Sequence, residues 1–166
     1  YEEMLEMASL GAKVMQPASI QEARLNRVEV DVRSTFSSKE GTRITKKKNI
    51  LSNNTIRGIS FTKNDAKLTL VGVRDKPGVA ASIFKPLFDN SINVDMVVRN
   101  ISAGGKETDL TFTIKLEDLN KTQKLVEKNN EIKFKKLIIN KNVSKVSIIG
   151  VGMITTPGVT FRMFKA

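Results

Sequence analysis

A short segment of the chain occurs twice. The run LTLVGV at residues 68–73 recurs as VSIIGV at residues 146–151, and Pro-Gly-Val follows each copy, at 77–79 and at 157–159. A Phe-Lys pair then comes at the same distance from the proline in both copies. Two copies of one supersecondary unit are expected to fold alike. Because little sequence follows the second copy before Ala166, we expect the natural protein to continue, or this copy to borrow strands from elsewhere.

The region around the first copy has the pattern of a small α+β domain. Apolar residues alternate in four segments and recur at helical spacing in two, which predicts the order strand, helix, strand, strand, helix, strand. The predicted strands are 68–73, 92–98, 110–114 and 134–139, and the predicted helices are 79–88 and 117–128. The segment 103–106 is predicted to be a hairpin connection. This order is typical of a ferredoxin-like βαββαβ fold, in which an antiparallel sheet packs on two helices.

The sequence before the first copy predicts helices, a strand and a linker. Residues 1–26 read as helical, and a capping box at Ser19–Glu22 predicts that a second helix begins there. We further expect a strand at 28–32, a loop at 34–42, a solvated basic linker at 43–54, a strand at 56–61 and a turn at Lys63-Asn64-Asp65.

Composition excludes several kinds of chemistry. The chain has no Cys, which excludes disulfides, thiolate metal sites and cysteine nucleophiles. It has no His, which excludes Ser-His-Asp catalysis and imidazole zinc sites. The pair Gly104-Gly105 falls in the predicted hairpin and not before a helix, so no phosphate-binding loop is expected. The sequence therefore predicts no catalytic residues and no metal site.

The positive charge does not by itself indicate a nucleic-acid partner. The formal net charge is +11, but the only dense basic run is Arg43 to Lys48, and aromatic residues make up 5% of the chain. A surface for stacking bases needs exposed aromatic rings among basic residues, and none is evident. No apolar run approaches the roughly 20 residues of a membrane span. We therefore expect neither a nucleic-acid partner nor a membrane partner.

The turn between the first strand and helix of the repeat is the best candidate binding site. Gly78 permits an unusual backbone conformation, and the N–H groups of Val79, Ala80 and Ala81 are free to bind a carboxylate. Asp75 would accept an ammonium group, so a free α-amino acid satisfies both ends. The alternative is an ordinary helix-entry turn with Asp75 as a local cap. The second copy has no acidic residue in its loop and would use hydroxyl and backbone groups.

The same motifs resemble a known family, the bacterial aspartate kinases. Their first ACT domain resembles the segments LVGVRDKPGVAA at 70–81, INVDM at 92–96, NIS at 100–102 and TDLTFT at 108–113. The start of their second ACT domain resembles KVSIIGVGM at 145–153 with PGV at 157–159. The end of their kinase domain resembles MLEMASLGAKVMQP at 4–17, with RSTF at 33–36 and GT at 41–42.

The resemblance implies a domain organisation. Residues 1–48 would be the C-terminal end of an α/β amino-acid-kinase domain, and 49–55 a linker. Residues 67–141 would be the first ACT domain, while 56–66 and 142–166 would form part of a second. It also implies a cytoplasmic parent enzyme that uses ATP and Mg²⁺ to phosphorylate the side chain of aspartate, the first step towards lysine, threonine, methionine and diaminopimelate. The family's phosphate-binding Lys-Phe-Gly-Gly motif is not in this sequence, so no cofactor is expected in this segment.

The resemblance also implies a regulatory role and assigns residues to it. ACT domains of this family bind lysine and/or threonine for feedback inhibition and pair with a second copy or with an α-type kinase subunit. The implied effector-binding residues are Asp75, Pro77, Gly78, Val79, Ala80, Ala81, Asn93, Val94, Asp95, Arg99, Asn100, Ser102 and Thr111. The implied second loop is Met153, Thr155, Thr156, Pro157, Gly158 and Val159. The family usually has Gln where Arg99 stands and Ser-His where Thr155-Thr156 stands. The alternative function is a separate amino-acid-binding or oligomerisation module without catalysis.

Overall fold

The computed structural model describes residues 1–46, 55–101, 107–150, 153 and 156–166. These residues form two compact units, one of residues 63–145 and one of residues 1–62 with 146–166. The domain boundaries inferred above stay predictions. Across the described ranges, no helix combines the length and the apolar character that a bilayer crossing requires.

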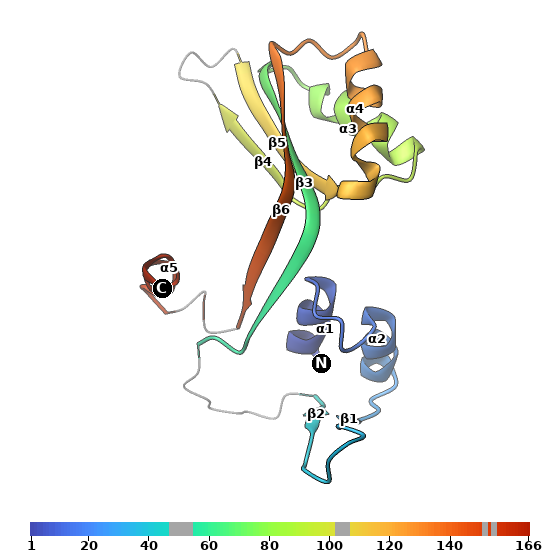
Figure 1. Cartoon of the computed structure of the whole chain (residues 1–166), viewed down its shortest axis with the longest axis vertical. Coiled ribbons are helices and arrows are strands. Elements are labelled where there is room, and N and C mark those ends of the chain that lie inside the picture. The colour runs from blue at the N-terminus through green and yellow to red at the C-terminus, as the bar shows by residue number, and fades with distance from the viewer. Residues whose placement is uncertain (47–54, 102–106, 151–152, 154–155) are drawn as a thin grey trace. The chain divides into compact units, whose positions relative to one another are not determined.

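The unit of residues 63–145 has the predicted βαββαβ order. Its elements, two of which extend beyond the unit, are β3 (Gly58–Arg74), α3 (Val79–Asp89), β4 (Val97–Ile101), β5 (Glu107–Lys115), α4 (Leu119–Lys128) and β6 (Lys136–Ile149). The strands form one sheet in the order β4-β5-β3-β6, in which β5 is antiparallel to both of its neighbours. Helices α3 and α4 cover one face of this sheet (Figure 1). The ferredoxin-like α+β fold is therefore confirmed.

The core of this unit lies between the sheet and the two helices. The alternation predicted for β5 places Leu110, Phe112 and Ile114 on the buried face, where Phe112 is 0% exposed. The ring of Phe84 from α3 meets the ring of Phe112 edge to face, with 5.4 Å between their centres. Burial of each such side chain stabilises the fold by about 1.5–3 kcal/mol. This core fixes the β3–α3 connection against the sheet.

A β-bulge in β3 decides which way the end of that strand faces. Leu70 pairs with Leu110, but Val73 pairs with Thr108, so β3 contains one extra residue. Gly72 lies in the bulge with φ +67°, and its N–H donates to Asp109 Oδ1 at 2.9 Å. Without the extra residue, Val73 would point away from the helices. The bulge instead buries Val73, which is 1% exposed, and turns Asp75 to the same side two residues later.

The second unit contains the N-terminal helices and a small sheet. Its elements are α1 (Glu2–Ser9), α2 (Pro17–Leu25), β1 (Val30–Val32), β2 (Thr42–Ile44) and α5 (Val159–Lys165). Tyr1, Ile20, Ala23 and Ile44 form its buried cluster. The hydroxyl of Tyr1 donates to the carbonyl oxygen of Val28 at 2.7 Å, which holds the first residue against the strand entry.

Two predictions about the N-terminal part are wrong. Helix α2 begins at Pro17 and not at the capping box, and no side chain caps it. Proline is favoured in the first helical turn because its missing N–H would have no partner there. The basic segment assigned to a solvated linker begins with β2, where Ile44 pairs with Val30 and is only 4% exposed. Burial of the apolar side chain of Ile44 in the cluster of this unit favours a strand here, although the neighbouring residues are charged.

Three predicted strand boundaries are also wrong. Strand β3 runs through the turn predicted at residues 63–65, and Asn64 takes a left-handed φ of +65° within it, a conformation that Asn tolerates as a single residue. The predicted strands 134–139 and 146–151 are one strand, β6, up to Ile149. Strand β4 begins at Val97, while Ile92 is buried in the segment before it. The predicted hairpin 103–106 and most of the predicted linker 49–55 lie outside the described residues.

Candidate functional site

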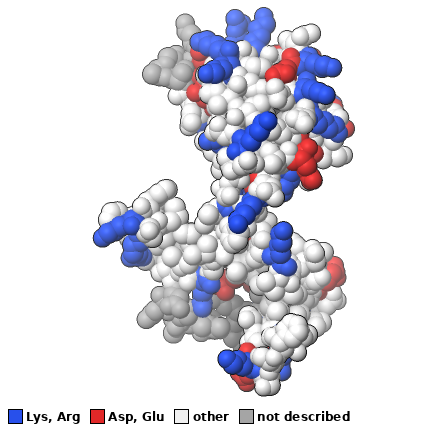
Figure 2. Space-filling view, viewed as in Figure 1, with Lys and Arg blue, Asp and Glu red and all other residues white. Residues whose placement is uncertain are grey.

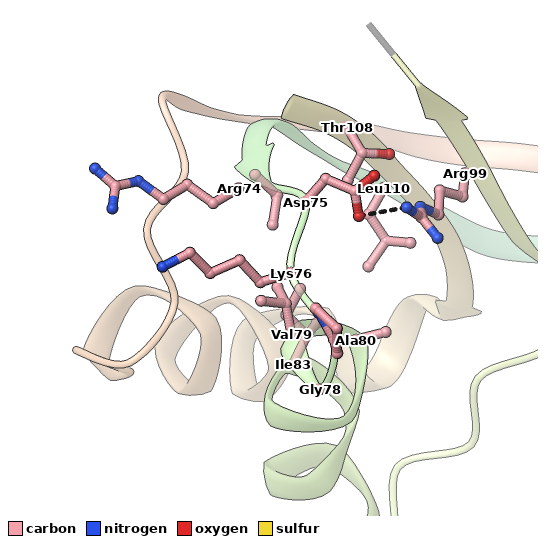
Figure 3. A pocket seen from close by; sticks show the side chains of 12 residues that line it. Arg74, Asp75, Lys76, Gly78, Val79, Ala80, Ile83, Arg99, Thr108 and Leu110 are labelled. Carbon is pink, nitrogen blue, oxygen red and sulfur yellow. Dashed lines mark hydrogen bonds and ion pairs between the residues drawn. The ribbon is translucent and has the colours of Figure 1, made fainter. Parts of the chain in front are cut away.

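A pocket of about 300 Å³ lies where β3 ends and α3 begins. It is the point where the strand-to-helix turn meets β4 and β5 (Figure 3). The residues that line it are Val73, Arg74, Asp75, Lys76, Pro77, Gly78, Val79, Ala80, Ile83, Arg99, Thr108 and Leu110. The floor is apolar and the rim is charged, an arrangement typical of sites for small polar ligands.

The turn into α3 presents backbone donors to this pocket. Gly78 is the residue before the helix and is left-handed, with φ +87° and ψ −16°. Its carbonyl oxygen accepts the N–H of Ser82 at 3.0 Å, as in a regular helix start. The N–H groups of the first helical turn have no partner within a helix and carry its partial positive charge. Val79 and Ala80 line the pocket in this turn, but the N–H of Val79 is not free as predicted, because it donates to the carbonyl oxygen of Lys76 at 3.3 Å. The partial positive charge of the helix start still suits an anionic group.

Asp75 and Arg99 form an ion pair across the pocket. Arg99 Nη2 on β4 contacts Asp75 Oδ1 in the loop, and the dashed line in Figure 3 marks this pair. The Asp75 side chain is 26% exposed and that of Arg99 48% exposed. Water screens such a pair, so its contribution to stability is small. A ligand can therefore replace the pair at low cost if it offers both charges.

Two further cations stand at the rim beside Asp75. Arg74 and Lys76 flank Asp75 in the sequence, and their side chains extend away from Arg99 in Figure 3. Both residues are exposed. The pocket therefore has one anionic and three cationic side chains in its lining. Because Arg74 and Lys76 are adjacent to Asp75 in the sequence, their presence at the site could have been predicted from it.

Hydrogen bonds behind the pocket hold its walls in place. Thr108, which is 6% exposed, donates from its hydroxyl to the carbonyl oxygen of Asn100 at 2.9 Å. This bond ties β5 to β4 directly beside Arg99. Lys135 Nζ, in the segment before β6, contacts Glu107 Oε2 of β5 at 2.6 Å. Strands β4 and β5 are thus linked by a side chain as well as by the backbone ladder.

The structure brings some of the predicted effector-binding residues together and separates others. Asp75, Pro77, Gly78, Val79, Ala80 and Arg99 line the pocket. Ala81 lies instead in a second, more open depression between α3 and the segment after α4. Ser102 lies outside the described residues. The assignment of effector-binding roles to all of these residues stays a prediction.

The other predicted positions have different surroundings. Asp95 forms an ion pair with Lys145, and its N–H donates to the carbonyl oxygen of Thr113 at 3.0 Å. Asn93 is exposed and Val94 packs against the core. Thr111 shares a hydrogen bond of 2.9 Å with Thr69 on the sheet face opposite Leu110, away from the pocket. The carbonyl oxygen of Asn100 accepts the hydrogen bond from the Thr108 hydroxyl.

Some lining residues were not predicted from the sequence. They are Val73, Arg74, Lys76, Ile83, Thr108 and Leu110. The apolar pattern assigns Val73, Ile83 and Leu110 to strands and a helix, but it does not show which of these residues border a cavity. Thr108 lies on the same face of β5 as Leu110, and the bulge in β3 makes Val73 its pairing partner.

The second copy of the turn has the same backbone form. Gly158 has φ +83° and ψ +2° and precedes α5 as Gly78 precedes α3. Val159 is 7% exposed, and the hydroxyl of Thr156 lies 3.4 Å from that of Thr55. Met153 is half-buried, and its N–H donates to the carbonyl oxygen of Gly150 at 3.3 Å. Thr155 lies outside the described residues, and Pro157 is exposed.

The described residues offer no cluster of potential metal ligands. Among them, no group of three or more Asp and Glu side chains is arranged to hold a metal ion.

Comparison with known proteins identifies relatives of this sequence. A family model described as "ACT domain" matches residues 68–129. The aspartate kinase of Pseudomonas putida is 42% identical over 168 residues, an alignment that covers 100% of this chain and 41% of that protein. The chain therefore spans about two fifths of the length of this relative.

Solved structures give similar results. The regulatory subunit of aspartate kinase from Thermus thermophilus, in a ligand-free form, is 31% identical with a TM-score of 0.61, and the match covers 68% of this chain and 74% of that one. Aspartokinase III of E. coli in complex with lysine and aspartate, in its T-state, is 26% identical with a TM-score of 0.65. That match covers 89% of this chain and 32% of that one.

Proposed function

This chain belongs to the aspartate kinase family, and from that premise we propose that its ACT domain senses an amino acid and regulates a kinase. The kinase would transfer phosphate from ATP to the side-chain carboxylate of aspartate in the cytoplasm, the first step towards lysine, threonine and methionine. The catalytic core and its ATP and Mg²⁺ would belong to sequence that this chain does not contain. The chain itself would supply the effector site.

The ion pair of Asp75 and Arg99 is the observation that carries this proposal. An α-amino acid has one ammonium and one carboxylate group. Inserted between the two side chains, it would give Asp75 an ammonium partner and Arg99 a carboxylate partner. The N–H groups at the start of α3 would support the carboxylate. When the amino acid separates Asp75 from Arg99, its ammonium group therefore takes the place of Arg99 and its carboxylate takes the place of Asp75.

We propose lysine and/or threonine as the effector. The support is the family and the E. coli aspartokinase III structure, which contains lysine together with aspartate. Binding would stabilise one arrangement of the regulatory region over another. Couplings of this kind between an effector and an active site typically amount to about 1–3 kcal/mol.

Isothermal titration calorimetry of the 166-residue chain with L-threonine, L-lysine and both together tests the proposal. At least one of these ligands should give a heat of binding that fits a one-site isotherm. Asp75→Asn should weaken binding by about tenfold or more, since a hydrogen bond to a charged group is worth about 1.5–3 kcal/mol. Glu117→Gln is the matched control, because Glu117 is exposed and does not line the pocket. Absence of binding by every amino acid, or equal effects of both variants, contradicts the proposal.

A second function, assembly through the sheet edge, is favoured by β4. This strand is at the edge of the sheet, and all five of its residues are exposed, including Val97 and Ile101. An open edge with apolar side chains is a template for pairing with another chain. We propose that a second copy or a kinase subunit pairs here. Sedimentation equilibrium should show a dimer that Val98→Lys disrupts, and a monomer at all concentrations contradicts it.

A further inference from the structure

Asp109 is the residue of β5 that lies opposite the β-bulge of β3. The pairs on either side of the bulge leave two residues of β3, Val71 and Gly72, facing this one residue of β5. A bulge of this kind leaves the extra residue without its regular partner in the ladder. Here the N–H of Gly72 donates instead to the side chain of Asp109, at 2.9 Å from Oδ1. The residue that faces the bulge therefore also binds it through its carboxylate.

Asp109 differs from the other acidic residues in the strands of this unit. Asp65 of β3 is paired with Lys115, and Glu107 of β5 is paired with Lys135. Figure 2 shows many Lys and Arg side chains on the face of this unit that is in view, so cationic partners are plentiful. Within the ranges that the structure describes, Asp109 nevertheless forms no ion pair. The bond to the bulge is thus the interaction that explains a carboxylate at this position.

Asp109 and the pocket are on opposite faces of the sheet. Residues alternate between the two faces along β5, and the neighbours of Asp109 on either side, Thr108 and Leu110, line the pocket. Asp109 does not line it. The bulge connects the two faces, because it decides that Val73 is directed towards the helices and that Asp75 follows on the same side. Loss of the bulge would turn both of these side chains to the other face.

We propose that Asp109 is a positioning residue of the effector pocket and acts through the backbone from the opposite face of the sheet. This inference rests on the proposed function, in which the pocket binds an amino acid. The carboxylate of Asp109 fixes the N–H of Gly72, and the left-handed conformation of Gly72 sets the direction of β3 beyond the bulge. The end of β3 then carries Asp75 towards Arg99, the pair that Figure 3 shows. Asp109 touches no ligand, but the affinity of the pocket depends on it.

A second contact supports the bulge independently of Asp109. The backbone N–H of Lys135, in the segment before β6, donates to the carbonyl oxygen of Val71 at 2.8 Å. The side chain of Lys135 then passes Gly72 and reaches Glu107. Asp109 is half-buried and is not part of the apolar core of this unit. Asp109→Ala should therefore leave the fold intact and loosen the bulge.

Amide hydrogen exchange of the full chain, followed by NMR, tests the bond to the bulge without a ligand. Exchange of the Gly72 N–H should become about tenfold faster or more in Asp109→Ala, because the amide loses a hydrogen bond to a charged group. Asp109→Asn keeps an acceptor oxygen and should restore most of the protection. The backbone signals of Asp75 and Gly78, on the pocket side, should shift in Asp109→Ala. Unchanged exchange at Gly72, or unchanged signals of Asp75 and Gly78, overturns the proposal.

Calorimetry with L-threonine and with L-lysine tests the consequence for binding. Whichever of them binds the unmodified chain should bind Asp109→Ala about tenfold more weakly, and Asp109→Asn should recover most of the affinity. Thr122→Ala is the control, because it removes a buried methyl group from α4, which does not line the pocket, and should leave the affinity unchanged.

Two results of the calorimetry contradict the role of Asp109. Equal weakening in Asp109→Ala and Thr122→Ala would mean that a general loss of stability is responsible, and failure of Asp109→Asn to recover affinity would mean that the acceptor oxygen is not. Either result overturns the proposal and leaves the proposed function intact. If the unmodified chain binds neither amino acid, the proposed function fails, and the exchange measurement decides whether Asp109 holds the bulge and the turn that follows it.

Discussion

Gly78 and Gly158 have nearly the same left-handed backbone conformation, with φ of +87° and +83° and ψ of −16° and +2°. Each precedes a helix and follows Pro in its copy of the repeat. A Cβ atom at either position would meet no atom within 4 Å. The repeat therefore preserves a backbone conformation that glycine adopts easily, and not a packing contact.

Gly78→Ala should destabilise the chain by about 1–2 kcal/mol, the cost of a left-handed conformation for a residue with a Cβ. Since there is space for the methyl group, strain is the only expected cause. Gly78→Asn should cost less, because Asn tolerates this conformation. Urea denaturation followed by circular dichroism measures both. Equal losses of stability in the Ala and Asn variants would show that the left-handed backbone conformation is not the cause.

The βαββαβ order and the core of this unit could be predicted because apolar periodicity reports burial directly. Leu110, Phe112 and Ile114 illustrate this, since each alternate residue of β5 is buried as expected. The ends of the elements could not be predicted so well. Asn64 and Pro17 each have two compatible roles, and the tertiary context decides between them: Asn64 continues a strand and Pro17 begins a helix.

The candidate site could be predicted only in part, for a similar reason. Asp75 and Gly78 belong to a local motif, so their positions in the turn followed from the sequence. Arg99 and Thr108 come from other strands, and the bulge at Gly72 decides that Val73 is the residue of β3 that pairs with Thr108. A single glycine in a strand indicates that a bulge is possible, but only the pairing of two strands shows in which direction it turns the chain.

Gly72→Ala should be more destabilising than Gly78→Ala. Gly72 is left-handed too, but its added Cβ would lie 2.7 Å from Lys135 Cδ. The variant therefore incurs strain and a steric clash, for a total of about 2–4 kcal/mol. A Lys135→Ala background removes the contacts with Cδ and Cγ and leaves only the Cβ contact at 3.3 Å, so the cost should fall towards that of Gly78→Ala. A double-mutant cycle by urea denaturation gives this difference, and additive effects of the two substitutions would contradict it.

Asp31 should titrate below the usual range of aspartate. The hydrogen bond from Arg43, together with the charges of Arg43 and Arg33, lowers the pKa of Asp31 below its ordinary value of 3.8. A carboxylate with a lowered pKa in the folded state contributes stability above its unfolded pKa, and this contribution is lost as the pH falls through the folded value. NMR titration of the Asp31 carboxyl carbon should show the lowered pKa, and Arg43→Gln should raise it. The same pKa in both proteins would contradict the role of Arg43.

Thr122→Val should leave the chain equally stable or stabilise it by up to about 1 kcal/mol. Thr122 on α4 is 0% exposed, and among the described residues its hydroxyl has no hydrogen-bond partner. Burying a polar group costs desolvation free energy, and a group without a hydrogen-bond partner makes no interaction that offsets this cost. Valine has the same shape and removes that cost, whereas Thr122→Ala removes a methyl group from the core as well and should destabilise. Thermal and urea unfolding of the two variants separate the effects. A large loss of stability in Thr122→Val would mean that the hydroxyl is bonded, for instance to a carbonyl one turn earlier in the helix.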